Sequence, residues 1–321
     1  MDLIYMNADH EDIGVLLDYE MDMAFGQDEN NFECTIGAAS HCCESGFFLY
    51  MEGTDYGGIV DGIGSKSDSG EVTYTGRTWH GLLNSKVIEP NSGQAYLTVS
   101  GEANSIIASL LSRMGLSDLF EASSEDSGLN ISNYQMNRYV KGYEGIKKML
   151  KTVDGKLLFA FRNGKVILTA TSVHDYSRDE EFDSDLVPFQ IKKTYKTVNH
   201  MICLGSGELE NRTVVHLYCD KNGTISRTQT QFGMDEITDV YDYPNAESEE
   251  ELIDGGMEQL KAMWGQDEMS VDFDGTSGSY DVGDIVGAFD NITGLSISAV
   301  ISKKIVTIKN GQITISYKVG E

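Results

Sequence analysis

Short runs of alternating apolar and polar residues, separated by glycine, serine, aspartate and asparagine, fill the first 100 residues of the chain. Successive side chains point to opposite faces of a strand, so this alternation predicts strands that bury one face. The segment DGIGSKSDSGEVTYTG indicates a hairpin whose turn runs from Ser67 to Gly70. The 34 glycines, against only 3 prolines, fit many turns and bulges. We therefore predict a β-barrel domain, or a pair of packed sheets, over residues 1 to 100.

The pattern changes near residue 100, where apolar residues begin to recur at helical spacing. The segment GEANSIIASLLSRMGL predicts a helix that ends at Gly115, and GYEGIKKMLKTVDG predicts a second amphipathic helix. The segment KLLFAFRNGKVILTATS predicts two strands joined at Asn163 and Gly164, because Asn-Gly between apolar runs is a strong hairpin signal. This order predicts a mixed α+β domain over residues 101 to 190.

Strand-like segments return after a charged loop, with a turn expected at Asn310 and Gly311. We predict a second β-barrel domain over residues 191 to 321, interrupted by a helical insertion at about residues 246 to 265. Ser248 is the expected N-cap of this helix. The predicted fold class is therefore α+β and β-rich, with two β-barrel domains and a mixed domain between them.

The charge of the chain argues against two classes of partner. The formal net charge is −27 and the pI is near 4.4, so the surface repels nucleic acid and anionic membranes. Such a surface suits a wall past which DNA slides without binding, although a need for solubility explains the charge equally well. No apolar run is long enough to span a bilayer, and the start MDLIYMNADHEDIG lacks the features of a secretory signal. We expect no membrane insertion.

The five cysteines indicate neither a disulfide framework nor a metal site. Their number is odd and two of them, Cys42 and Cys43, are adjacent, which suits folding in a reducing cytoplasm. His41 directly precedes this pair, whereas the ligands of a tetrahedral zinc site are usually two to four residues apart. We expect no bound metal and no cofactor.

The remaining motifs do not combine into a catalytic site. Gly205 and Gly207 follow a predicted strand in LGSGELENR, but the third glycine of a dinucleotide-binding loop and the lysine of a phosphate loop are missing. His200 and His216 lie within apolar strands, where a hydrogen-bonded structural histidine is the usual case. No Gly-x-Ser-x-Gly elbow stands between a strand and a helix. We therefore expect that the chain is not an enzyme.

The stretch TYTGRTWHGLLNSKVIEP concentrates arginine, tryptophan, histidine and lysine in a short span, and we interpret it as structural. Trp79 is expected to be a large apolar anchor of a short helical turn that Pro90 ends. Arg77 can pair with one of the many carboxylates. The apolar side of the turn is expected to hold Leu82, Leu83, Val87 and Ile88.

The same stretch resembles the Gly-Arg-x-x-x-x-Leu-Leu-x-x-Arg-x-Ile-x-Pro pattern of a family of siphophage and prophage tail proteins. Lys86 stands where this family has its second arginine, which keeps the charge but not the bidentate fork. Two later blocks resemble the family in the same order, NHMICLGSGELENRTVV and the Val-Gly-Asp region that begins YDVGD, so the resemblance covers nearly the whole chain. The residues that carry it are Gly76, Arg77, Leu82, Leu83, Ile88, Pro90, Gly205, Gly207, Arg212, Val282, Gly283 and Asp284, with Trp79 inside the first block.

The resemblance implies a baseplate hub or tail-tip protein, similar to the central hub protein of contractile phage baseplates. In that fold, two tail-tube-like β-barrel domains per subunit let a homotrimer imitate a six-fold ring. The implied partners are a distal tail or tail tube protein, a tape-measure protein, and tail-tip spike or receptor-binding proteins. DNA would pass through the lumen without specific binding. The implied location is the virion tail or a tail-like particle, after assembly in the bacterial host cytoplasm.

Two other functions stay open at this point. Related tail-tip proteins carry a peptidoglycan-cleaving domain after the hub region, but we expect none here because the chain ends at Glu321, directly after the last predicted strands. A carbohydrate-binding adhesin would use Trp79, Trp264 and some of the 16 tyrosines as stacking platforms. Aromatic residues at these frequencies are more often core residues, which favours the structural function.

Overall fold

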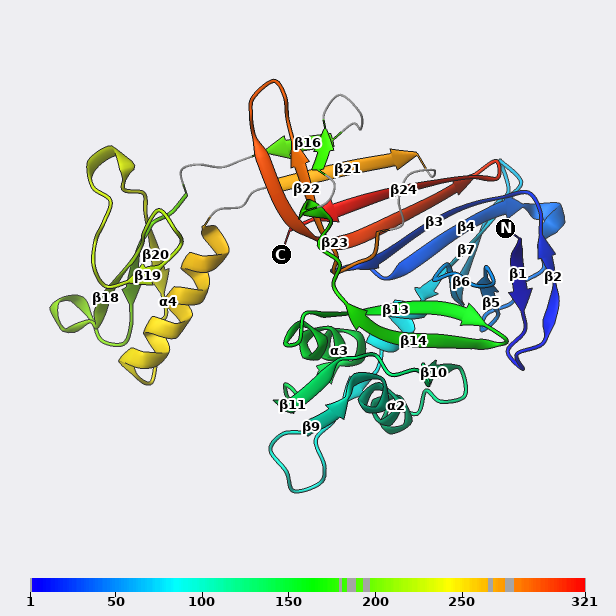
Figure 1. The fold of residues 1–321 in the computed structure, drawn as a ribbon, viewed down its shortest axis with the longest axis horizontal. Coiled ribbons are helices and arrows are strands. Elements are labelled where there is room, and N and C mark those ends of the chain that lie inside the picture. Colours follow the sequence, from blue (N-terminus) through cyan, green and yellow to red (C-terminus); the bar gives the residue numbers. More distant parts are fainter. Residues whose placement is uncertain are drawn as a thin grey trace. The chain divides into compact units, whose positions relative to one another are not determined.

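The computed structural model describes residues 2–178, 181–183, 189–192, 197–264, 268–274 and 280–320. The chain divides into two compact units (Figure 1), the first made of Met1–Gln190 with Met269–Glu321 and the second of Ile191–Glu268. The predicted α+β, β-rich fold class is confirmed, since strands outnumber helices in both units. Within the described ranges, no helix combines the length and the apolar character that crossing a membrane requires.

A large sheet dominates the first unit and contains 13 strands in the part of the chain that the structure describes. These strands are β1 (Leu3–Met6), β2 (Asp12–Leu16), β3 (Tyr19–Gly26), β4 (Asn31–Gly37), β5 (Phe48–Tyr50), β6 (Gly57–Lys66), β7 (Glu71–Thr78), β15 (Glu181–Asp183), β16 (Phe189–Lys192), β21 (Glu268–Asp274), β22 (Ile285–Phe289), β23 (Ser296–Lys309) and β24 (Gln312–Val319). Their order is β16-β21-β24-β23-β3-β4-β7-β6-β5-β1-β2, and β22 pairs with β15 and β23 beside this path.

Alternation of apolar and polar residues explains why the N-terminal segments form strands. In β4, Phe32, Cys34 and Ile36 are buried, and the residues between them are more exposed. The register continues across the sheet, with Met21 of β3 opposite Cys34 and Tyr74 of β7 on its other side. Strands β6 and β7 form the hairpin predicted from the sequence. One face of the sheet therefore covers a continuous apolar core.

The last two long strands belong to this same sheet. β23 pairs antiparallel with β3, with Val306 opposite Met23, and Figure 1 shows β23 and β24, in orange and red, beside the blue β3 and β4. Val306 and Ile308 are buried in the core of the N-terminal strands. This grouping differs from the predicted ranges, because the C-terminal strands bury their apolar face against residues 1 to 100. The division into three functional domains, over residues 1 to 100, 101 to 190 and 191 to 321, stays a prediction.

The large sheet is open in the described part of the chain. β2 stands at one end of the strand order, and no strand pair among the described residues joins the two ends. The sequence predicts a β-barrel or a pair of packed sheets at the N-terminal end and a β-barrel at the C-terminal end, and the described strands do not form a closed barrel. Alternation specifies which face of a strand is buried, whereas closure depends on pairing between strands far apart in the sequence.

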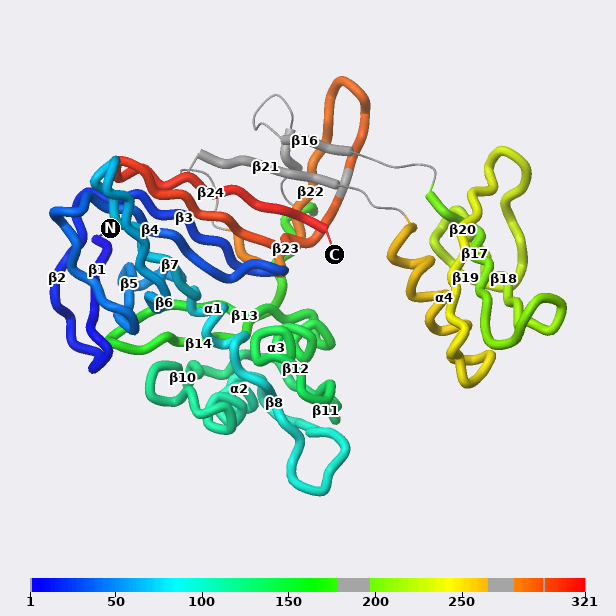
Figure 2. Tube along the Cα trace, turned by 180° about the vertical axis from the view of Figure 1, so that it is seen from behind, coloured from blue at the N-terminus to red at the C-terminus, as the bar shows by residue number. Residues whose placement is uncertain are grey.

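Helices and short strands of the mixed segment pack beside this sheet. β13 and β14 lie between the large sheet and helices α2 and α3 (Figures 1 and 2), and the three-stranded sheet has the order β10-β14-β13. The two predicted helices are confirmed as α2 and α3, and the predicted hairpin turn joins β13 to β14. The elements are α1 (Trp79–Asn84), β8 (Val87–Ile88), β9 (Thr98–Glu102), α2 (Ala103–Arg113), β10 (Phe120–Ala122), β11 (Asn130–Gln135), β12 (Val140–Lys141), α3 (Gly142–Lys151), β13 (Gly155–Arg162) and β14 (Lys165–Ser172).

The second unit is a four-stranded sheet in its described residues, with one helix on it. The strand order is β19-β18-β17-β20, and Leu252 and Leu260 of the helix pack on the buried face of the sheet. Ser248 accepts a hydrogen bond from the Glu251 N–H at 3.1 Å, so the predicted N-cap is confirmed; residue 265, the predicted helix end, lies outside the described residues. The elements are β17 (His200–Leu204), β18 (Val214–Cys219), β19 (Ile225–Ser226), β20 (Thr238–Asp242) and α4 (Glu249–Met263).

Candidate functional site

Gly76 and Arg77 lie on β7, where this strand pairs with β6. The Arg77 guanidinium donates to both carboxylate oxygens of Asp61 at 2.7 Å and to Ser85 Oγ at 3.1 Å. These hydrogen bonds, together with the positive charge of Arg77, hold the pKa of Asp61 below its usual value. A Cβ at Gly76 would lie 1.8 Å from the carbonyl oxygen of Ile59. Both residues therefore serve the packing of β6 on β7.

Trp79 begins α1 and is completely buried. Its ring stacks on Phe161 of β13 with 5.4 Å between the ring centroids, and Leu82 and Leu83 join the same core. The Trp79 Nε1–H has no hydrogen-bond partner among the residues that the structure describes. The structure thus places the tryptophan in a packing role between α1 and the three-stranded sheet.

The end of this block departs from the predicted helical turn. The helix ends at Asn84, and Ile88 lies on a separate strand, β8, which pairs with β12. Ile88 is 1% exposed but Val87 is 41% exposed, because neighbouring residues of a strand point to opposite faces. Pro90 follows this strand, so it does not end the helix.

Gly205, Gly207 and Arg212 close a tight loop between β17 and β18 of the second unit. Arg212 Nε donates to the carbonyl oxygen of Gly205 at 3.0 Å, and its guanidinium pairs with the carboxylate of Asp242. Gly207 has a φ of +101°, and a Cβ there would lie 2.4 Å from the carbonyl oxygen of Asn211. The contacts of this motif are internal to the second unit, which agrees with a structural role.

Asp284 is fully buried and accepts three hydrogen bonds. Its donors are Lys156 Nζ at 2.7 Å, the backbone N–H of His174 at 3.0 Å and the backbone N–H of Asp281 at 2.9 Å. Lys156 Nζ also donates to Asp281 at 3.1 Å. The preceding Gly283 has a φ of +105°, a conformation that favours glycine. This buried ion pair ties the start of β13 to the segment before β22.

The strand β13 brings two of the three motif blocks together. Phe161, near its end, stacks on Trp79, and Lys156, near its start, bonds Asp284. Between them, the Phe159 ring contacts the His80 ring of α1 with 3.8 Å between centroids. The third block lies in the second unit. Two of the sequence blocks therefore converge on a strand that neither of them contains.

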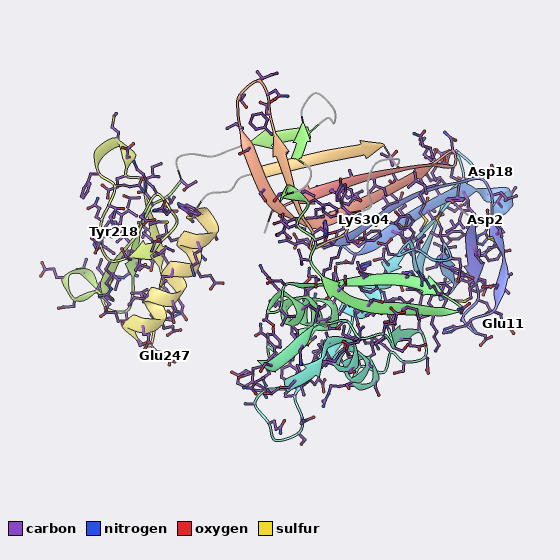
Figure 3. The ribbon with its side chains drawn as sticks, in the orientation of Figure 1. Asp2, Glu11, Asp18, Tyr218, Glu247 and Lys304 are labelled. Carbon is purple, nitrogen blue, oxygen red and sulfur yellow. The ribbon has the colours of Figure 1, made fainter. Side chains whose placement is uncertain are left out.

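A cavity of about 310 Å³ adjoins β13, β23 and the loop before β6. The ammonium group of Lys304, labelled in Figure 3, lies 3.2 Å from the Asp55 carboxylate and 5.1 Å from the centroid of the Tyr56 ring. Burial alone would lower the pKa of Lys304, but the nearby Asp55 and the neighbouring tyrosines raise it above the usual value. Burial raises the pKa of Asp55.

His80 forms part of the wall of this cavity and is 4% exposed. Its Nδ1 has no hydrogen-bond partner among the described residues. Burial lowers the pKa of His80, and the positive charges of Lys304 and Lys147 lower it further, so the ring stays neutral. Sequence reasoning missed this cavity. The signal that could have found it is a lysine inside an apolar strand, as in KLLFAF and ISKKIVTI.

The other candidates from the sequence lie apart from this cavity. His200 is 8% exposed and bonds Glu236 at 2.7 Å and His216 at 2.8 Å, as a structural histidine would. All five cysteines are free thiols, and the Sγ atoms of Cys42 and Cys43 lie 3.8 Å apart. Within the described part of the chain, no group of three or more histidine, cysteine, aspartate or glutamate residues is arranged to hold a metal ion.

The fold is similar to solved structures along its whole length, although no protein-family model and no curated protein matches the sequence. The 43 kDa tail protein of prophage MuSo2 from Shewanella oneidensis has a TM-score of 0.57 and 11% identity, covering 100% of this chain and 98% of that one. A tail protein from Neisseria meningitidis has a TM-score of 0.52 and 12% identity, covering 100% and 96%. A chain of the phage P2 baseplate, in its activated conformation with Ca, has a TM-score of 0.51 and 11% identity, covering 98% of each chain.

Proposed function

We propose that this chain is a structural protein of a phage tail, or of a tail-derived particle, and that it forms a trimeric hub ring that continues the tail tube. The observation that carries the proposal is the similarity of fold over the full length to two tail proteins and a baseplate chain. Because the match covers both units, a single common sheet does not explain it. Catalysis is not part of the proposed role.

An exposed sheet edge supports the proposal of a ring. β2 stands at the end of the strand order, and the apolar side chains of Ile13, Val15 and Leu17 alternate along and just after it, 51%, 45% and 77% exposed. Exposed apolar edge strands readily pair with other chains. A closed ring needs a contact between two different surfaces of neighbouring copies, and β2 would supply one of them.

The polar face of the sheet supports the passage of DNA. Glu20, Asp22 and Glu33 are exposed on the face of β3 and β4 opposite the core, and Lys309, 3.1 Å from Glu20, offsets only part of their charge. We assign this face to the lumen. With a net charge of −27 on each chain, such a wall would repel the phosphates of DNA and let it pass without binding.

In this assembly the chain would contact two further copies of itself and the neighbouring tail components. These are a distal tail or tail tube protein on one side, and tail-tip spike or receptor-binding proteins on the other, with the tape-measure protein inside the tube. The protein would assemble in the host cytoplasm and be found in the virion tail.

The ring is tested by native mass spectrometry and negative-stain microscopy of the full chain, alone and mixed with a purified tail tube protein. We expect a trimeric ring. Val15→Lys, which places a charge on the β2 edge, should reduce the trimer fraction about tenfold. Ile292→Lys, at a residue that is 92% exposed outside the large strands, is the matched control and should leave it unchanged. A monomer under both conditions would contradict the ring.

The lumen assignment has a separate test in phage particles. Replacing Glu20, Asp22 and Glu33 together with lysine should slow or stall DNA ejection, because the reversed charge attracts phosphate. Unchanged ejection kinetics would show that this face of the sheet does not line the lumen.

A further inference from the structure

One edge of β13 has no strand partner among the described residues, since β13 stands at the end of the order β10-β14-β13. Arg162 and Lys165 face each other across the two-residue turn, so Arg162 and the alternate residues before it, Ala160 and Leu158, exchange backbone hydrogen bonds with β14. The residues between these positions direct their backbone N–H and C=O groups to the opposite edge of β13. Phe161 shows this directly, because its N–H donates to the Thr54 carbonyl oxygen and its own carbonyl oxygen accepts from Gly53, both at 2.8 Å.

The same alternation directs the backbone groups of Leu157 and Phe159 toward the free edge. Both residues line the cavity of about 310 Å³, and on this edge their N–H and C=O groups have no hydrogen-bond partner among the described residues. Open backbone groups at alternate positions are what an added strand pairs with. The volume lies at the small end of the range for ligand pockets, which suits a few residues of an extended chain.

The cavity region also carries more carboxylate than ammonium. Two lysines, Lys156 and Lys304, face three aspartates. Asp284 is fully buried and accepts three hydrogen bonds, and Asp55 is paired with Lys304. Asp281 shares Lys156 with Asp284 and is 31% exposed. A cation that enters the cavity therefore meets Asp281 first.

Aromatic side chains complete the wall of the cavity. Phe25, Tyr56 and His80 line it, and the faces of Phe25 and Tyr56 already lie 5.6 Å and 5.1 Å from the Lys304 ammonium. Aromatic faces attract cations and cover the aliphatic stems of lysine and arginine. Because the Lys304 ammonium already lies over these faces, the wall can cover the aliphatic stem of a lysine or arginine and leaves its charged end to Asp281.

We propose that this cavity binds an extended segment of a partner polypeptide that carries a lysine or an arginine. The main chain of the segment pairs with Leu157 and Phe159, and its basic side chain reaches Asp281 along the aromatic wall. The open backbone groups select a peptide over a simple amine, because they require alternating donors and acceptors. The excess carboxylate disfavours nucleic acid. The site does not depend on the ring, since its lining lies within the first unit.

The test titrates a capped peptide, acetyl-Thr-Val-Lys-Val-Thr-amide, against the full-length protein and follows amide hydrogen exchange residue by residue. We expect the peptide to slow exchange at Leu157 and Phe159. A peptide with norleucine in place of lysine should bind about tenfold more weakly, since it loses one charged hydrogen bond. Asp281→Asn should weaken the lysine peptide by about the same factor. Glu121→Gln is the matched control, because Glu121 is exposed on β10 at the opposite edge of the same small sheet.

Several results would overturn the proposal. They are no binding of the lysine peptide at millimolar concentration, equal binding of the lysine and norleucine peptides, and binding that leaves exchange at Leu157 and Phe159 unchanged. A different outcome is that these two amides exchange slowly in the protein alone and that their protection increases with protein concentration. This would show that a second copy of the chain occupies the edge instead. If Asp281→Asn does not fold, the two peptides on the unmodified protein still decide the question.

Discussion

Replacing Asp284 with asparagine measures how strongly the buried ion pair holds the first unit together. The side chain is 0% exposed, and its carboxylate accepts from Lys156 Nζ and from two backbone N–H groups. In the variant the side chain at 284 is a neutral amide, so the Lys156 ammonium, which is 8% exposed, keeps only Asp281 as a charged partner among the described residues. Removing one member of a buried pair costs about 3–5 kcal/mol. Because Asp281 keeps part of the interaction, we expect a loss of about 3 kcal/mol, at the lower end of this range.

The two tryptophans allow this loss to be assigned to one unit. Trp79 lies in the first unit and Trp264 in the second, so in a Trp264→Phe background fluorescence reports the unfolding of the first unit alone. With a urea m-value of about 3 kcal/mol per molar, a loss of about 3 kcal/mol lowers the unfolding midpoint by about 1 M. The transition of the second unit, followed by Trp264 fluorescence in the protein that keeps both tryptophans, should have an unchanged midpoint.

A second substitution separates the ion pair from general damage. Lys156→Met combined with Asp284→Asn removes the ammonium that the single variant leaves poorly paired, so the double variant should be more stable than Asp284→Asn alone. A midpoint shift below about 0.3 M for Asp284→Asn, equivalent to about 1 kcal/mol, would refute the reasoning. So would a double variant whose loss equals the sum of the two single losses.

Three further predictions concern stability. Gly76→Ala should cost the first unit about 3 kcal/mol, because the new methyl group meets a carbonyl oxygen of β6 at 1.8 Å, whereas Gly64→Ala, with its nearest atom 3.8 Å away, should change the urea midpoint little. Burial raises the pKa of Glu102, but hydrogen bonds from Ser127 and the first turn of α2 outweigh this and lower it to about 2. Its stabilising effect is therefore complete above a pH of about 4.5 and lost as the pH falls toward 2, so thermal unfolding of Glu102→Gln should depend less on pH in this window. Arg212→Ala should destabilise the second unit by about 1 kcal/mol, seen as an earlier Trp264 transition.

Turns and helices could be predicted because their signals lie within a few residues of one another. Asn163 and Gly164 form the turn between β13 and β14, and both have positive φ, as an Asn-Gly hairpin turn requires. Gly115, with a φ of +68°, follows α2 where the helix was expected to end. Ser248 caps α4 in the predicted way. Each of these features depends only on local backbone conformation and on side chains one turn away.

The cavity and the buried ion pair next to it could not be predicted in this way, because their residues are brought together over long separations. Lys156 bonds Asp284 across 128 residues, and Lys304 bonds Asp55 across 249 residues. Each lysine lies in an apolar strand, so the sequence shows an ionisable group in the core without showing its partner. No spacing rule applies at these separations.

The order of amino acids alone was enough to establish a β-rich α+β chain, its hairpins and helices, and the faces its strands bury. The tertiary structure was needed to show that β23 pairs with β3, that the described sheet is open at β2, and that β13 keeps a free edge beside a charged cavity. The backbone of a strand can pair with almost any other strand. The choice of partner therefore follows from which apolar faces can be buried together across the whole chain.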